Sequence, residues 1–174
     1  MRSMFEVFFQ KRNGVNNIMF KTKHYVPILK WKSAEKSALK ALRAEDKRLM
    51  TPLIQFMTPQ LTIKELIGKT DNEKFDGTIS KFKTNIKKMP AEIVDYWGLT
   101  PVFVDFSLLL SELRMEAIET ILKGGGAMGS IFIPVLYIDD NKEIKNLVKN
   151  YKNGLCLRLV YADLDNLSTL GKSA

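Results

Sequence analysis

Cysteine and histidine are scarce in this sequence of 174 residues. The single cysteine, Cys156, excludes an internal disulfide and is typical of a reducing compartment. It lies in the apolar run LCLRL, where a buried inert thiol is the favoured interpretation. The single histidine, His24, precedes a strand-like run and is interpreted as a strand-entry residue. We therefore expect neither a His-based metal site nor a Ser-His-Asp triad, and no cofactor.

Long apolar runs are also missing. No run approaches the ~20 residues that a membrane-spanning helix needs. Near the amino terminus, Glu6 and Gln10 interrupt the apolar residues, so the segment lacks the apolar core of a secretory signal. These absences predict a cytoplasmic protein that does not enter a membrane.

Positive charge is abundant but unevenly distributed. The chain has 27 Lys and Arg against 19 Asp and Glu, a net charge of +8. Residues 1–50 contain 12 basic and 4 acidic residues, whereas residues 51–174 contain 15 of each. A localised basic face attracts a nucleic acid or an acidic protein partner. A surface helix with a basic arm would give the same composition without any partner.

The rest of the sequence alternates between strand-like and helix-like segments. Strands that are apolar on both faces and separated by helices indicate an α/β fold with a parallel sheet covered on each side. Two architectures fit equally: a partial TIM-barrel-like arrangement of repeating βα units with about five strands, or an open doubly wound sheet. The strands are predicted at 25–32, 51–57, 101–106, 131–138 and 155–160, and the main helices at 34–48, 75–89, 111–123 and 140–152.

A hairpin is predicted ahead of this alternation. Two apolar segments within residues 4–20 flank Asn13 and Gly14, a pair that suits the positive φ angles of a tight hairpin turn. We therefore divide the chain into an extension or hairpin arm at 1–18 and a single α/β domain at 19–174.

A candidate site emerges at the carboxyl ends of the strands, where ligands bind in parallel α/β folds. Alternation along the first strand places Lys30 and Lys32 on one face, at its carboxyl end. With Arg158 they form a candidate anion-binding set, and Asp105 and Glu35 are the acid–base candidates. Solvated or structural salt bridges between the same residues are the alternative.

The segment GGGAMG at 124–129 resembles a phosphate-binding loop but has the wrong position. Such loops leave a strand and enter a helix, whereas this one follows a predicted helix and precedes a strand. We therefore predict a helix C-cap and turn.

Several of these segments together resemble a known family. The pattern Y-x-P-I-L-K-x-K-x-x-E at residues 25–35, followed by TPLIQF and PVFVDFS, resembles the beta protein family of tailed bacteriophages and bacteria. The resemblance covers roughly residues 19–165, about half of a typical member, and implies a barrel-like fold and a bacterial or phage-infected cytoplasm. Gln55 stands where the family pattern has an acid, and Ala34 where it has Gly. The lost carboxylate weakens a carboxylate-based catalytic role.

Two hypotheses of function follow. The favoured one is a non-catalytic binding or interaction protein with a basic N-terminal third. The alternative is the half or remnant of a barrel enzyme that binds a phosphorylated or carboxylated small molecule. Because a partial barrel leaves open sheet edges, we also expect self-association, unless the hairpin covers an edge.

Overall fold

The computed structural model describes residues 24–159 and residue 163. The predicted hairpin at 4–20 lies outside these residues. In the described part, the strands are β1 (Ile28–Lys30), β2 (Leu53–Gln55), β3 (Val102–Asp105), β4 (Phe132–Leu136) and β5 (Cys156–Leu157). The helices are α1 (Ser33–Ala41), α2 (Ala44–Arg48), α3 (Ile63–Leu66), α4 (Asp71–Ile86), α5 (Met89–Trp97), α6 (Ser111–Ala127) and α7 (Lys142–Lys149). None of these helices is long and apolar enough to cross a membrane.

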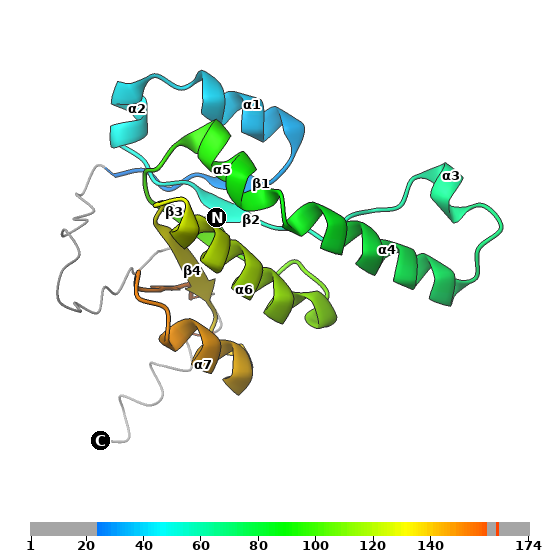
Figure 1. The fold of residues 1–174 in the computed structure, drawn as a ribbon. Coiled ribbons are helices and arrows are strands. Elements are labelled where there is room, and N and C mark those ends of the chain that lie inside the picture. The colour runs from blue at the N-terminus through cyan, green and yellow to red at the C-terminus, as the bar shows by residue number, and fades with distance from the viewer. Residues whose placement is uncertain (1–23, 160–162, 164–174) are drawn as a thin grey trace.

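The five strands form a parallel sheet in consecutive order, β1-β2-β3-β4-β5 (Figure 1). This confirms the predicted α/β fold of repeating βα units. A doubly wound sheet reverses its strand order at a switch point, whereas the strands of a (β/α) barrel follow one another in sequence. The observed order is that of the barrel-like alternative.

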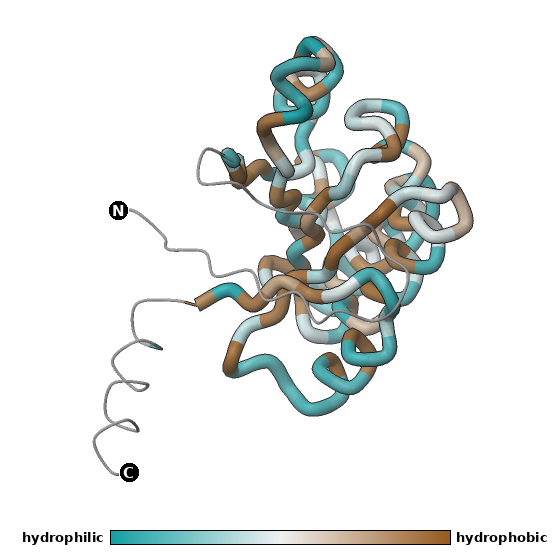
Figure 2. The backbone as a smooth tube through the Cα atoms, turned by 90° about the vertical axis from the view of Figure 1, so that its left-hand side faces the viewer, coloured by the Kyte–Doolittle hydropathy of each residue, from teal (hydrophilic) through white to brown (hydrophobic). Residues whose placement is uncertain are grey.

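The two faces of the sheet pack differently. One face carries Ile54, Val104 and Phe132 into the main core, which also contains buried residues of the helices. The other face carries a smaller cluster around Leu53, Phe103 and Ile133. Within the described residues, no helix contributes to this second cluster. Figure 2 shows the apolar chain segments running through the middle of the fold, with polar segments around them.

The predicted helix at 34–48 is interrupted. Leu42 has an extended backbone (φ −66°, ψ 137°) and packs against the main core, so α1 ends at Ala41 and α2 begins at Ala44. Lys32 occupies the N-cap position of α1, without a side-chain capping hydrogen bond, and Ser33 is the first residue of the helix.

The predicted helix at 75–89 is also divided, between α4 and the start of α5. α4 ends at Ile86, and Pro90 lies in the first turn of α5, where the missing N–H of proline has no helical partner to lose. Phe82 and Ile86 are buried, whereas Phe75 is exposed. Figure 1 shows α3 and the amino-terminal part of α4 projecting from the sheet and its neighbouring helices.

The glycine-rich segment is helical where a turn was predicted. α6 continues to Ala127, and only Gly129 adopts a positive φ (+73°). The reason is close packing against neighbouring elements. A Cβ atom on Gly124 would lie 2.6 Å from Cγ of Pro90, and one on Gly125 would overlap the ring of Phe132. The glycines therefore let α6 approach α5 and β4.

Candidate functional site

Asp105, the last residue of β3, is the centre of a polar cluster at the carboxyl edge of the sheet. Its side chain is fully buried. Oδ2 accepts hydrogen bonds from Nε2 of Gln55 (3.0 Å), the hydroxyl of Tyr137 (2.8 Å) and Nη1 of Arg158 (3.0 Å). Oδ1 accepts one from the backbone N–H of Ser107 (2.9 Å). Both carboxylate oxygens are therefore engaged.

Strand register explains why these side chains meet. Lys30 pairs with Gln55 across β1 and β2, and Gln55 pairs with Asp105 across β2 and β3. On the other side, Tyr137 and Arg158 follow the paired residues Leu136 and Leu157. Because side chains alternate along strands, these end residues share the face of the smaller apolar cluster.

Tyr137 and Arg158 complete the cluster through direct contact. Nη1 of Arg158 donates to the Tyr137 hydroxyl oxygen (2.8 Å), and the guanidinium lies 5.7 Å from the centre of the tyrosine ring. Burial, reinforced by the charge of Asp105, raises the pKa of Tyr137 to about 12. The phenol is therefore protonated at neutral pH and donates its hydrogen bond to the carboxylate.

Cys156 lies in β5 on the same face and is buried. Burial raises the pKa of its thiol to about 12, and the charge of Asp105 acts in the same direction. A thiol that is buried and protonated is a poor nucleophile, in agreement with the inert role predicted from the sequence.

A second layer of contacts ties the cluster to α6. Nη2 of Arg114 donates to the carbonyl of Ser107 (2.5 Å), and Nη1 lies 3.5 Å from Oδ1 of Asp140. Oδ2 of Asp140 in turn accepts from the backbone N–H of Tyr137 (2.8 Å). The loops after β3 and β4 are thereby held together.

The predicted site residues separate into two groups. The structure brings Arg158 and Asp105 together in an ion pair, which was one of the structural alternatives. Lys30 lies in register with this pair but is exposed, and it forms no ion pair within the described chain. Lys32 lines a separate cavity beside α1, and Glu35 lies in the first turn of α1 without an ion pair to any described residue.

His24, the single histidine, lies beside Thr51 at the start of the described residues. Nε2 of His24 lies 2.9 Å from Oγ1 of Thr51, and partial burial lowers the pKa of its imidazole. Among the described residues, no three His, Cys, Asp or Glu side chains gather closely enough to hold a metal ion.

Sequence reasoning missed Tyr137 and Arg114. Tyr137 could have been found, because alternation from the apolar residues Ile133 and Val135 of β4 places it on the same face as Asp105. Arg114 could not, because its contacts with Ser107 and Asp140 depend on how α6 packs against two loops.

The family model described as Beta protein matches residues 25–173, which is most of the chain. No curated protein and no solved structure matches it significantly. The match begins at Tyr25, the first residue of the pattern noted in the sequence, and includes the strands that carry the Asp105 cluster. This chain belongs to the Beta protein family.

Proposed function

We propose that this protein is a non-catalytic binding protein whose basic first fifty residues hold an anionic partner, a nucleic acid or an acidic protein. The carboxyl edge of the sheet carries the argument. Asp105, the strand-end carboxylate, is buried with both oxygens hydrogen-bonded, so it is poorly placed to accept a proton from a substrate. Lys30 pairs in strand register with Gln55, which in turn pairs with Asp105. Lys30 is exposed and has no ion pair in the described part of the chain.

Part of the basic excess has a structural role. Nζ of Lys36 lies 2.5 Å from Glu92, and Nζ of Lys40 lies 3.0 Å from Asp95, so two lysines of α1 pair with acids of α5. Within residues 24–50, three exposed cations make no ion pair with described residues: Lys30, Lys32 and Arg48. These are the groups available to a partner.

The alternative enzyme has less support. It needs Lys30, Lys32 and Arg158 to hold an anion while Asp105 and Glu35 exchange protons. Arg158 already faces Asp105, and Lys32 lines a different cavity from the Asp105 cluster. Gln55, which donates to Asp105, leaves the edge without the second carboxylate of the family pattern.

We also propose that the protein self-associates. The exposed Ile28 in the edge strand β1 supports self-association through the sheet edge, which sedimentation would detect as a concentration-dependent dimer.

We propose that the chain consists of an arm at 1–18 and a single α/β domain at 19–174. We also place the protein in a bacterial or phage-infected cytoplasm, a setting with which the single buried thiol of Cys156 agrees.

The test is binding of fluorescent single- and double-stranded oligonucleotides and of polyglutamate, measured by anisotropy at two salt concentrations. We expect one of these polyanions to bind, with an affinity that falls as salt rises. Lys30→Ala should weaken binding several-fold. Lys123→Ala, an equal loss of charge on the exposed surface of α6, should have little effect.

Two results would contradict this proposal. One is the absence of salt-dependent binding to any of the polyanions. The other is binding of free phosphate or a sugar phosphate that persists at high salt and disappears in Lys30→Ala, which would favour the enzyme.

A further inference from the structure

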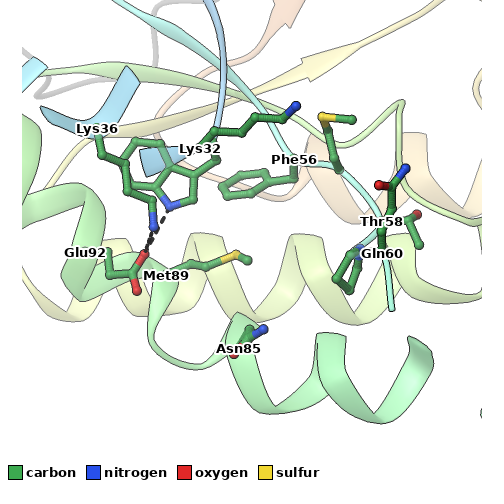
Figure 3. Close-up of a pocket in the computed structure, with 11 residues that line it drawn as sticks. Lys32, Lys36, Phe56, Thr58, Gln60, Asn85, Met89 and Glu92 are labelled. Atoms are coloured by element: carbon green, nitrogen blue, oxygen red, sulfur yellow. Dashed lines mark hydrogen bonds and ion pairs between the residues drawn. The ribbon is translucent and has the colours of Figure 1, made fainter. Parts of the chain in front are cut away.

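A cavity of about 430 Å³ lies beside the carboxyl ends of β1 and β2, between these strand ends and the helices α4 and α5. Its lining comes from four places in the chain: the segment after β1, the start of α1, the segment after β2, and the region where α4 gives way to α5. Figure 3 shows Lys32 and Phe56 on one side of the space, Asn85 and Met89 on the opposite side, and Thr58 and Gln60 at one end. The volume falls within the range of small-molecule sites.

The apolar wall of the cavity is held in place by its neighbours. Nε1 of Trp31 donates to Glu92 (3.2 Å), and its ring meets that of Tyr96 edge-on at 6.2 Å between centroids. Phe56 is buried and stacks on Phe106 at 5.3 Å. Glu92 in the cavity wall, together with Tyr96 and Phe106 outside it, holds these rings in place, so a ligand ring would meet a preformed surface.

The polar groups of the cavity leave one positive charge uncompensated. Lys36 is paired with Glu92. The side-chain ammonium of Lys32 makes no hydrogen bond or ion pair within the described chain, and the same holds for the side-chain amides of Gln60 and Asn85. The hydroxyl of Thr58 is occupied, since it accepts from the backbone N–H of Leu110 (3.0 Å).

We propose that this cavity binds a small molecule that joins one flat aromatic ring to one anionic group. The ring of the ligand packs against Trp31 and Met89. Stacking on an aromatic side chain is favourable for the π-face of any flat ring. The anionic group, a phosphate or a carboxylate, pairs with Lys32. The amides of Gln60 and Asn85 are available to the polar edge of the ring.

This site goes beyond the proposed function and shares only Lys32 with it. The polyanion surface depends on Lys30 and the other exposed cations, whereas the cavity depends on Trp31, Lys32 and the amides. The two proposals can therefore fail separately.

The test is calorimetric titration of the full chain with probes that separate ring from anion. The phosphate arm uses adenosine monophosphate, adenosine and ribose 5-phosphate, and the carboxylate arm uses indole-3-acetate, indole and acetate. In at least one arm, the probe with both parts should bind about tenfold more tightly than either part alone. Equal affinity for the complete probe and one of its parts in both arms would overturn the proposal, as would no binding of either complete probe.

Variants then locate the site. Lys32→Met should reduce the affinity for the complete probe to that of the ring alone, whereas Lys30→Ala should leave it unchanged. Asn85→Trp, at an exposed position on the cavity wall, should block the probe and spare polyanion binding. Asn72→Trp places the same side chain elsewhere on α4 and should have no effect. If Lys30→Ala weakens the probe as much as Lys32→Met, or Asn85→Trp binds normally, the ligand lies outside the cavity and the proposal is wrong.

Discussion

Removing Arg158 should destabilise the protein more than removing an ordinary surface cation. The guanidinium lies 3.0 Å from a carboxylate that is 0% exposed, and its own side chain is 19% exposed. Loss of one partner from a buried ion pair leaves the other charge uncompensated and costs about 3–5 kcal/mol. Because Gln55, Ser107 and Tyr137 still donate to Asp105, we expect Arg158→Met to fall at the lower end, about 3 kcal/mol.

A double-mutant cycle tests the origin of this loss. Asp105→Asn removes the buried charge, so in that background Arg158→Met should cost only about 1 kcal/mol, the value of a neutral hydrogen bond. The coupling free energy is then about 2 kcal/mol. Urea denaturation followed by tryptophan fluorescence measures all four variants, and in thermal unfolding Arg158→Met alone should lower Tm by roughly 6–12 °C. If Arg158→Met costs below about 1 kcal/mol, or costs the same with Asp105 and with Asn at that position, the buried charge is not what Arg158 stabilises.

Three further predictions concern the same edge and its supporting helix. Because burial raises the pKa of both Tyr137 and Cys156 to about 12 from ordinary values of 10 and 9, the folded state holds these protons longer than the unfolded state. The free energy of unfolding should therefore be unaffected by these groups below pH ~9 and fall as pH rises from about 9 to about 12. Over this pH range, urea midpoints should fall less steeply for Tyr137→Phe than for wild type or for the control Tyr25→Phe at an exposed site. Equal slopes for the three proteins would contradict this. Gln55→Glu should place a second carboxylate beside Asp105, where Nε2 of Gln55 now lies at 3.0 Å. The repulsion should lower Tm at pH 7, and should lower it less at pH 4, where one carboxyl group takes up a proton. An unchanged Tm at both pH values would show that the edge tolerates two charges. Gly125→Ala should destabilise the protein by about 1–3 kcal/mol, because the new methyl group overlaps Phe132. Gly126→Ala, whose methyl group would meet only the Tyr151 hydroxyl at 3.7 Å, should stabilise the protein by about 0.5–1 kcal/mol through helix propensity. Chemical denaturation of both variants checks this, and a neutral Gly125→Ala would show that β4 and α6 can move apart.

The sequence by itself determined the class of fold and the approximate place of the strands. Each strand is a short apolar run whose period and flanking residues are local properties, and all five were predicted within a few residues of their observed positions. Alternation also placed Lys30 at the carboxyl end of β1, because a strand fixes the direction of each side chain, and Asp105 was expected at the same edge of the sheet. The pattern at residues 25–35 was sufficient to indicate the family.

Tertiary structure decided which polar residues contact one another. Consecutive strand order distinguished the barrel-like sheet from the doubly wound one, and this order depends on contacts between segments far apart in sequence. The helical glycines of α6 follow from the closeness of Pro90 and Phe132, which no local propensity records. The sequence left open whether Arg158 binds a ligand anion or pairs with Asp105. The structure shows the ion pair, because the sheet brings a buried carboxylate within 3.0 Å and an uncompensated charge there would be costly.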